Sequence, residues 1–191
     1  YRIPAEPGTG SAWYPGAVSG KDVFIVSSRR LLRIRGNGVK EAVLPGESSV
    51  KASPVVCGSR VCVITGTTLF LFDRETLSVL RTIPVESRFA VDDNYEPGCE
   101  SARLYIPFRN GGYYRLDLSG SSSVFSLLYR EVFPLSPVIT SEAVYIGSFY
   151  DNYIARLSLE GTEEWRFPLD GRSFCNFVYR DGLLYSYRER E

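Results

Sequence analysis

The densest group of side chains that could do chemistry is the acidic stretch DDNYE at residues 92–96. Such carboxylates can hold a calcium ion, because hard cations prefer oxygen ligands, or can serve as the paired acids of glycoside hydrolysis. The stretch lacks the spacing and the glycine of an EF-hand loop. One loop rarely presents two acids to opposite sides of a scissile bond, so a partner acid is required, and Asp151 is the nearest candidate by topology. We therefore expect a solvated turn, with no metal site and no catalytic residue.

Other chemistry is limited by missing residue types. The sequence holds no His, which excludes Ser-His-Asp and Cys-His nucleophile systems and His-based zinc or iron sites from this chain. Its four Cys are Cys57, Cys62, Cys99 and Cys175, and none of them forms a CxxC pair. We interpret each as a small buried hydrophobic residue. A disulfide is the alternative, and four Cys allow three pairings.

The balance of charges narrows the class of partner. Lys and Arg together number 22, and so do Asp and Glu, which makes the net charge zero. Binding to the phosphate backbone of a nucleic acid requires an excess of basic residues, which this chain lacks. We therefore expect no nucleic-acid partner. No apolar run reaches the length of about 18 residues that a transmembrane segment needs. Because the sequence starts at Tyr1 and contains no Met, we expect a processed or trimmed form without its leader.

Aromatic side chains beside Arg, Asp and Asn recur in segments that we expect to be loops. Rings offer flat apolar area and polar groups fix the orientation of a ligand, which suits recognition of a sugar or a protein segment. The alternative is that loops are polar in any case and that the tyrosines pack between sheets. The candidate binding residues are Trp13, Tyr14, Arg29, Arg30, Asp92, Asp93, Asn94, Tyr95, Arg109, Asn110, Tyr150, Asp151 and Asn152.

These loops can meet only if a repeated unit brings them to one face. Five hairpins, each an apolar run, a polar turn and a second apolar run, recur along the chain. Their second runs begin at Val23, Val61, Leu104, Val144 and Leu183, with spacings of 38, 43, 40 and 39 residues. A period of about 40 residues with several short strands per unit is typical of a β-propeller blade.

Each of the first four hairpins is followed by two more apolar runs, so the repeat predicts an all-β propeller of four-stranded antiparallel blades. In such blades, the loops leading into the first strand and those between the second and third strands lie on one face. We expect a single domain, 1–191, of five blades. Their approximate bounds are 13–46, 50–86, 89–132, 133–169, and 172–191 together with 1–8.

The last blade needs strands from elsewhere, because the chain ends soon after its first hairpin. Tyr1-Arg2-Ile3-Pro4 reads like Trp165-Arg166-Phe167-Pro168, the expected fourth strand of the preceding blade. We therefore expect the N-terminal strand to close the last blade and to remove a free sheet edge. Four blades with a frayed hairpin, or a piece of a larger ring, are the alternatives.

The stretch SPVITSEAVYIGSFYDNYIARLSLEGTEEWRF at residues 136–167 resembles the repeat of quinoprotein-dehydrogenase-like propellers, the PQQ-like repeat, and residues 53–76 resemble it more weakly. Dehydrogenases of that family bind their quinone beside a calcium ion and two adjacent cysteines, and no Cys-Cys dipeptide occurs here. The chain looks more like family members without a cofactor. The resemblance therefore implies no cofactor and an extracytoplasmic scaffold protein, whether periplasmic, secreted or lumenal.

Taken together, these observations predict a non-catalytic binding or scaffold module that presents an aromatic and polar loop face to a protein or carbohydrate. The alternative is a carboxylate-dependent glycosidase of the five-bladed propeller type. Apart from the 92–96 loop, the expected innermost strands offer only Ser, Cys and Asn near their starts, which favours the binding module.

Overall fold

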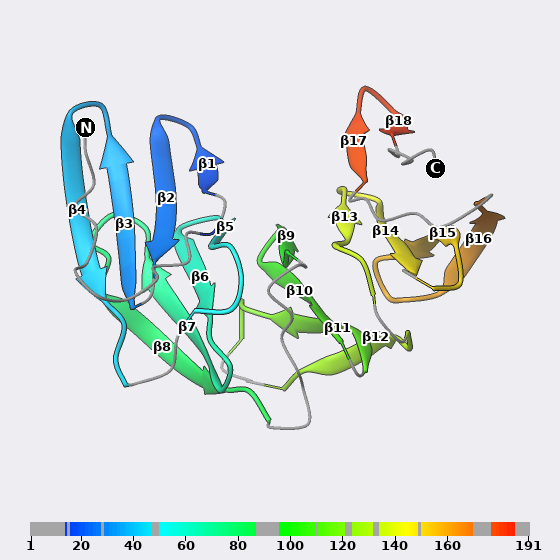
Figure 1. Ribbon diagram of the computed structural model, residues 1–191, viewed down its shortest axis with the longest axis horizontal. Coiled ribbons are helices and arrows are strands. Elements are labelled where there is room, and N and C mark those ends of the chain that lie inside the picture. Colours follow the sequence, from blue (N-terminus) through cyan, green and yellow to red (C-terminus); the bar gives the residue numbers. More distant parts are fainter. Residues whose placement is uncertain are drawn as a thin grey trace. The chain divides into compact units, whose positions relative to one another are not determined.

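The computed structural model describes residues 14, 16–27, 29–46, 50–86, 96–109, 111–120, 124–131, 134–148, 150–169 and 177–185. The regular elements in these segments are strands, β1 to β18, and no helix occurs among them (Figure 1). Each strand pairs antiparallel with its neighbours in sequence within a sheet. The chain divides into two compact units, residues 1–87 and 88–191, and each is described by itself.

Unit 1 contains two four-stranded sheets, blade 1 and blade 2, each in simple up-and-down order. The strands of blade 1 are β1 (Ala17–Ser19), β2 (Asp22–Ser27), β3 (Arg30–Arg35) and β4 (Gly38–Val43). Those of blade 2 are β5 (Val55–Cys57), β6 (Arg60–Ile64), β7 (Thr68–Asp73) and β8 (Val79–Pro84).

Unit 2 contains two further blades of the same order and one hairpin. The strands of blade 3 are β9 (Gly98–Glu100), β10 (Arg103–Phe108), β11 (Gly112–Asp117) and β12 (Ser126–Tyr129). Those of blade 4 are β13 (Val138–Ile139), β14 (Ala143–Ser148), β15 (Tyr153–Ser158) and β16 (Glu163–Pro168). The last hairpin consists of β17 (Val178–Arg180) and β18 (Leu183–Tyr185).

The predicted repeat is confirmed at the level of its strands. In each of the four blades, the second strand begins one residue before its predicted start. The strand β18 begins at Leu183, as predicted. The chain is therefore an all-β protein built from four-stranded propeller blades. The predicted closure by Tyr1–Pro4 lies outside the described residues, as do the third and fourth strands of the last predicted blade.

Packing between blades explains why a strand such as β6 is apolar on both faces. Successive side chains of a strand point to opposite faces, so a strand covered on both sides buries every residue. In β6, Val61, Cys62, Val63 and Ile64 are all buried. Side chains of blades 1 and 2, including Phe24, share one hydrophobic cluster.

Tight turns join the first two strands, as their polar sequences predict. The turns Ser101-Ala102 and Asp181-Gly182 hold both central residues at positive φ, the conformation of the two-residue hairpin turn that matches strand twist. This geometry fixes the register in which β10 pairs with β9 and β18 with β17.

The cysteines divide into two groups. Cys62 is a buried free thiol, and burial raises its pKa to about 12, so it behaves as the small hydrophobic residue that we expected. For Cys57 and Cys99 that expectation is wrong, because each is disulfide-bonded. Cys175 lies outside the described residues. The sequence could not separate the two groups, because pairing depends on distances between strands that spacing alone does not give.

Reducing the disulfide cysteines should lower stability. Cross-linking constrains the unfolded chain, so we expect reduction to lower the free energy of unfolding by about 2–4 kcal/mol. Thermal unfolding with and without dithiothreitol measures this effect. A Cys57→Ser, Cys99→Ser double variant should already show the lowered Tm and should not respond to the reductant. An equal Tm for oxidised and reduced wild type would contradict the prediction.

Candidate functional site

The predicted binding residues fall into three groups. Those at described positions in unit 1 are Tyr14, Arg29 and Arg30, and those in unit 2 are Arg109, Tyr150, Asp151 and Asn152. The remaining predicted residues, Trp13, Asp92, Asp93, Asn94, Tyr95 and Asn110, lie outside the described residues.

In unit 1, the predicted residues serve the blades themselves. Tyr14 is half-buried against the cluster shared by blades 1 and 2, and its hydroxyl donates to the carbonyl of Val50 at 3.0 Å. Arg30 forms an exposed ion pair with Glu41 at 3.2 Å. The backbone carbonyl of Arg29 accepts from the N–H of Leu44 at 2.7 Å. The structure therefore gives Tyr14 the packing role that was the alternative for these tyrosines.

In unit 2, Tyr150, Asp151 and Asn152 lie in the turn between β14 and β15. The N–H of Asp151 donates to Ser148 Oγ at 3.2 Å, and that hydroxyl lies 3.3 Å from Asp151 Oδ2. Asn152 adopts a left-handed conformation with φ of 48°, and its carbonyl accepts from Leu169 N–H at 2.7 Å. Tyr150, at the tip, is 56% exposed. Arg109 follows β10 in the corresponding turn of blade 3 and is exposed.

A cluster that the sequence analysis did not identify joins blades 3 and 4. We call it the Tyr–Glu–Arg cluster, and it consists of Tyr129, Glu131, Tyr153, Glu163 and Arg166. The Tyr129 hydroxyl donates to Glu163 Oε2 at 2.6 Å, and the Arg166 guanidinium donates to both oxygens of Glu163 at 3.1 and 2.8 Å. Arg166 also donates to the Tyr129 hydroxyl and lies 4.0 Å above the Tyr153 ring. The hydroxyl of Tyr153 donates to the buried carboxylate of Glu131.

The electrostatics of this cluster favour fixed protonation states. The hydrogen bond from Arg166, followed by that from Tyr129, holds the pKa of Glu163 below its usual range. Burial, together with the hydrogen bond to Glu131, raises the pKa of Tyr153. Glu163 is therefore ionised and Tyr153 protonated near neutral pH. The cluster can hold a shape and present charge, whereas a general acid requires a carboxyl of raised pKa.

Two residues of β11 fix the backbone around this cluster, Gly112 within blade 3 and Tyr113 toward blade 4. The backbone at Gly112 has φ of 105°, and a Cβ there would lie 2.2 Å from the carbonyl oxygen of Tyr129. This close approach sets the position of Tyr129 and Glu131 relative to β11. The neighbouring Tyr113 hydroxyl lies 2.7 Å from the carbonyl oxygen of Gly147 and 2.9 Å from that of Leu135. The available sequence signal was EEWR at 163–166, which places an acid and an arginine on one strand.

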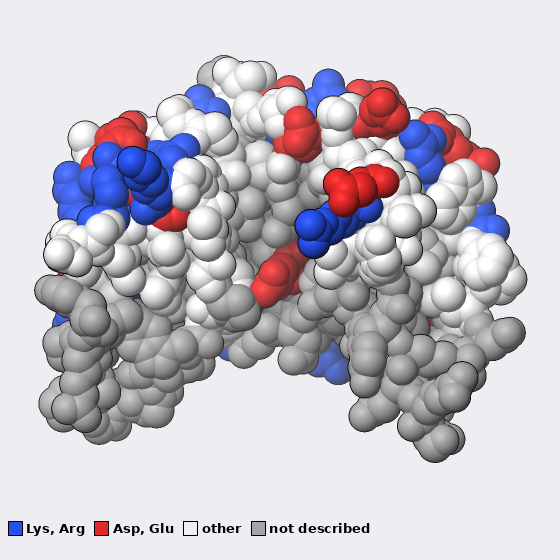
Figure 2. All heavy atoms as spheres, turned by 90° about the horizontal axis from the view of Figure 1, so that it is seen from above, with Lys and Arg blue, Asp and Glu red and all other residues white. Residues whose placement is uncertain are grey.

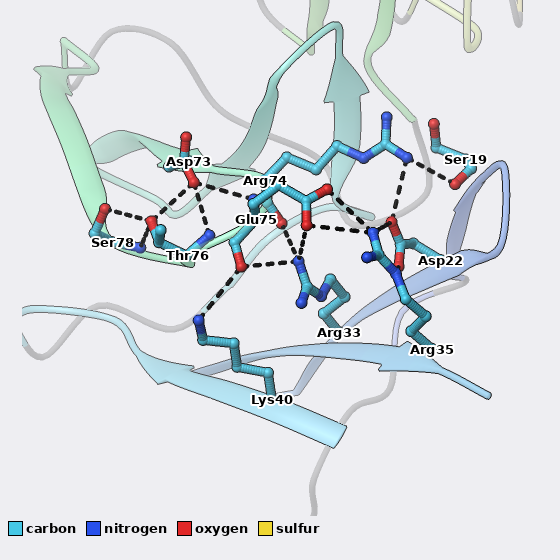
Figure 3. A network of polar contacts seen from close by, with 10 residues as sticks. All are labelled: Ser19, Asp22, Arg33, Arg35, Lys40, Asp73, Arg74, Glu75, Thr76 and Ser78. Atoms are coloured by element: carbon cyan, nitrogen blue, oxygen red, sulfur yellow. Dashed lines mark hydrogen bonds and ion pairs between the residues drawn. The ribbon is translucent and has the colours of Figure 1, made fainter. Parts of the chain in front are cut away.

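A second polar network lies in unit 1, where the start of β2 meets the β7–β8 turn (Figure 3). The Asp22 carboxylate, 1% exposed, accepts from Arg35 at 2.6 and 2.7 Å and from Arg74 at 3.2 Å. Arg33 of blade 1 donates to the carbonyl and carboxylate oxygens of Glu75 in the β7–β8 turn at 2.8 and 3.0 Å. Hydrogen bonds from Arg35, with a further one from Arg74, lower the pKa of Asp22 to about 2.

This network joins blade 1 to blade 2. A contact equivalent to that between Arg33 and Glu75 occurs in unit 2. Arg115, at the fourth position of β11 as Arg33 is in β3, donates to the carbonyl of Leu159 and to Glu160 Oε2, both at 2.7 Å. Both acceptors lie in the β15–β16 turn of the following blade. Because each of these arginines and carboxylates contacts a group of opposite charge, we interpret these contacts as structural.

The face of the molecule shown in Figure 2 carries charges of both signs. In Figure 2, Lys and Arg lie beside Asp and Glu in small mixed groups, as the net charge of zero predicts. Among the described residues, no three His, Cys, Asp or Glu are grouped so as to hold a metal ion. The described part of the chain also holds no helix with the length and apolar character needed to cross a membrane.

Comparison with known proteins identifies the fold. No family model matches the chain, and no curated protein matches it. Among solved structures, the computationally designed protein Ika8 matches with a TM-score of 0.71 at 12% identity, over 90% of this chain and 54% of that one. Streptogramin B lyase matches with a TM-score of 0.67 at 15% identity, over 87% and 57%.

A third match is BBS1N in complex with ARL6DN, with a TM-score of 0.58 at 15% identity, over 81% of this chain and 51% of that one. At such identities the likeness shows the propeller fold alone. The chain spans about half the length of the solved structures that it matches. An enzyme, a designed protein and a protein complex stand among them, so the fold leaves the function to be argued from the site.

Proposed function

We propose that this chain is a non-catalytic module that binds a protein segment through the loop end of blades 3 and 4 in unit 2. The observation that carries the proposal is the β14–β15 turn, where Tyr150 is 56% exposed at the tip of a turn held by Ser148 and Asp151. Tyr153 of the Tyr–Glu–Arg cluster begins β15 directly after this turn, and its hydroxyl donates to Glu131 of blade 3.

The physical case rests on the kind of surface that this turn forms. An exposed tyrosine offers a large flat area at low cost in conformational entropy, and such rings are enriched where proteins bind one another. Asp151 and the exposed Arg109 give the neighbouring surface charges of both signs. Charges at a rim set the orientation of a partner and repel mismatched ones.

Two further observations support the proposal. One matching propeller, BBS1N, is a protein that binds another protein, ARL6DN. In the Tyr–Glu–Arg cluster, Glu163 has a lowered pKa and its oxygens are bound by Arg166 and Tyr129, which suits a structural carboxylate and not a general acid.

The disulfide-bonded Cys57 and Cys99 further suggest an oxidising, extracytoplasmic location.

Truncating Tyr150 should abolish most of the binding without affecting the fold. Peptides selected from a phage-displayed random library on the wild type serve as the probe. Interface aromatics cost about 2 kcal/mol or more when truncated, so Tyr150→Ala should weaken the selected peptides by about 30-fold. Isothermal titration calorimetry measures the affinity, and the Tm should stay unchanged because the ring is exposed.

The matched control is Leu127→Ala, another exposed apolar residue of unit 2, on β12. Peptides that bind Tyr150→Ala as tightly as the wild type would contradict the proposal. So would a library that yields no binder while a glycan array does, because the partner would then be a carbohydrate.

A further inference from the structure

Among the described strands, β4 pairs only with β3, so its other side is an edge of the blade 1 sheet (Figure 1). The fourth strand of every described blade takes this position, because the four blades share one up-and-down strand order. The N–H and C=O groups along such an edge can pair with another chain. Proteins therefore protect their edge strands, and blade 1 differs from the other blades in this respect.

The fourth strands of the other blades carry features that protect an edge. A register shift interrupts the pairing of β8 with β7, of β12 with β11 and of β16 with β15. Such bulges twist an edge away from a flat partner. The strands β8 and β16 also end in Pro84 and Pro168, and β12 has only four residues. In contrast, β4 pairs without interruption from Gly38 to Val43 and contains no Pro, so it is regular enough to accept another strand.

One hydrogen bond fixes which groups of β4 face the edge. The N–H of Leu44, directly after β4, donates to the carbonyl of Arg29 at 2.7 Å. In an antiparallel pair, residues that bond to the partner strand alternate with residues whose N–H and C=O groups point away from it. By this alternation, Val39, Glu41 and Val43 direct both backbone groups to the edge. Among the described residues, no backbone hydrogen bond reaches these groups.

The side chains of β4 set the chemistry of a partner strand. Glu41, whose side chain is 40% exposed, lies on one face between Val39 and Val43. Lys40 is exposed on the other face, where its ammonium group donates to the carbonyl of Glu75 at 3.3 Å (Figure 3). Opposite charges and apolar pairs stabilise directly opposed residues of two strands. A complementary strand therefore has a basic residue opposite Glu41, an acidic residue opposite Lys40 and apolar residues opposite the two valines.

A second copy of β4 does not meet this requirement. Antiparallel pairing that aligns the three outward-facing residues of two copies places Glu41 opposite Glu41. Like charges directly opposite one another destabilise a pair of strands. The charge of Glu41 therefore disfavours its own copy and favours a different chain with a basic residue at this position.

We propose that β4 binds an extended segment of a partner protein, which adds antiparallel to blade 1 as a fifth strand. Backbone hydrogen bonds with Val39, Glu41 and Val43 provide the affinity, and the order of apolar, basic and acidic residues in the segment provides the specificity. This site is separate from the β14–β15 turn and does not rest on the function proposed for that turn. A free peptide loses conformational entropy when it becomes a strand, so a short peptide binds such an edge weakly.

Amide exchange resolved by residue tests strand addition on the wild-type chain. The probe is a synthetic peptide at about 1 mM that places Val, Lys, Glu and Val opposite Val43, Glu41, Lys40 and Val39. We expect NMR to show solvent exchange slowed by about twofold or more at the outward N–H groups of Val39, Glu41 and Val43. Exchange at Lys40 and Ala42 should stay unchanged, because their N–H groups already bond to β3. Equal slowing at all five residues, or at none, would overturn the proposal.

A proline substitution tests the edge itself. Glu41→Pro removes an outward N–H and keeps the hydrogen bonds to β3, so the variant should fold with the same Tm as Glu41→Ala. Glu41→Ala is the matched control, because it loses the same side chain and keeps the N–H. In NMR titrations, Glu41→Ala should bind the peptide less than about 5-fold more weakly than wild type, and Glu41→Pro about 10-fold more weakly again. Equal affinities for the two variants would contradict strand addition.

Further controls separate this site from the one proposed in unit 2. Tyr150→Ala should bind the synthetic peptide as the wild type does, and Glu41→Pro should bind the library-selected peptides as the wild type does. Failure of one site is therefore distinguishable from failure of the other. A peptide with its Lys and Glu exchanged should bind about 5-fold more weakly. If wild type without peptide sedimented at twice the mass of one chain with Val39, Glu41 and Val43 already protected, a second copy would occupy β4 and the proposal would be wrong.

Discussion

Gly112→Ala should destabilise unit 2 by about 3–5 kcal/mol, because it combines backbone strain with a clash that the structure cannot relieve locally. At φ of 105° an alanine is in a region that L-residues rarely adopt. Its Cβ would also lie 2.2 Å from the carbonyl oxygen of Tyr129 and 2.6 Å from the backbone nitrogen of Glu131. Both contacts are with backbone, so β12 must move away from β11.

Urea unfolding followed by circular dichroism measures this loss. The same displacement carries Tyr129 and Glu131 away from Arg166 and Tyr153, so the variant should also lose affinity for peptides selected on the wild type. Gly66→Ala is the control, because a Cβ at Gly66 meets no atom within 4 Å. If the Gly112→Ala variant were as stable as Gly66→Ala, the result would contradict the close approach of β11 to the end of β12.

Asp22→Ala should destabilise unit 1 by about 3 kcal/mol. Removing one partner of a buried ion pair costs about 3–5 kcal/mol, and the partial exposure of Arg35 and Arg74 favours the lower end of that range. The control is Glu41→Ala, which removes only the exposed ion pair with Arg30 and should cost less than about 1 kcal/mol. Equal losses in the two variants would contradict the account of the Asp22 network.

The pH dependence gives this prediction a second readout. The pKa of Asp22 falls from its usual value of 3.8 to about 2 in the folded chain, mainly through Arg35. A lowered folded-state pKa contributes stability that is complete above the unfolded-state pKa and is lost as the pH falls toward the folded-state value. The stability difference between wild type and Asp22→Ala should therefore be constant above about pH 4 and shrink between pH 4 and pH 2.

The strand repeat could be predicted from the sequence because burial on both faces leaves a direct trace in it. Val61, Leu104 and Val144 are all buried at the same place in their blades, and each lay at the start of a predicted run. The turns were equally visible, since Asp181-Gly182 combines the residues that tolerate positive φ. Such features depend on neighbours in sequence, which is why a single sequence reveals them.

The site was harder to predict because its contacts join residues that are far apart in the chain. Tyr153 meets Glu131, and Tyr129 meets Glu163, across 22 and 34 residues. Nothing in the local sequence separates Tyr14, which packs against blades 1 and 2, from Tyr150, which is exposed at a turn. The difference is set by which blade covers each ring, and that depends on tertiary structure.

The central claim is that a protein segment binds at the loop end of blades 3 and 4. Hydrogen–deuterium exchange of the chain, with and without a peptide selected on it, tests this claim most directly. We predict that the peptide slows exchange at Arg109 and at Tyr150–Asn152, while exchange in β1–β8 stays unchanged. Slowed exchange confined to unit 1 or to the last hairpin, with none at Tyr150–Asn152, would contradict it.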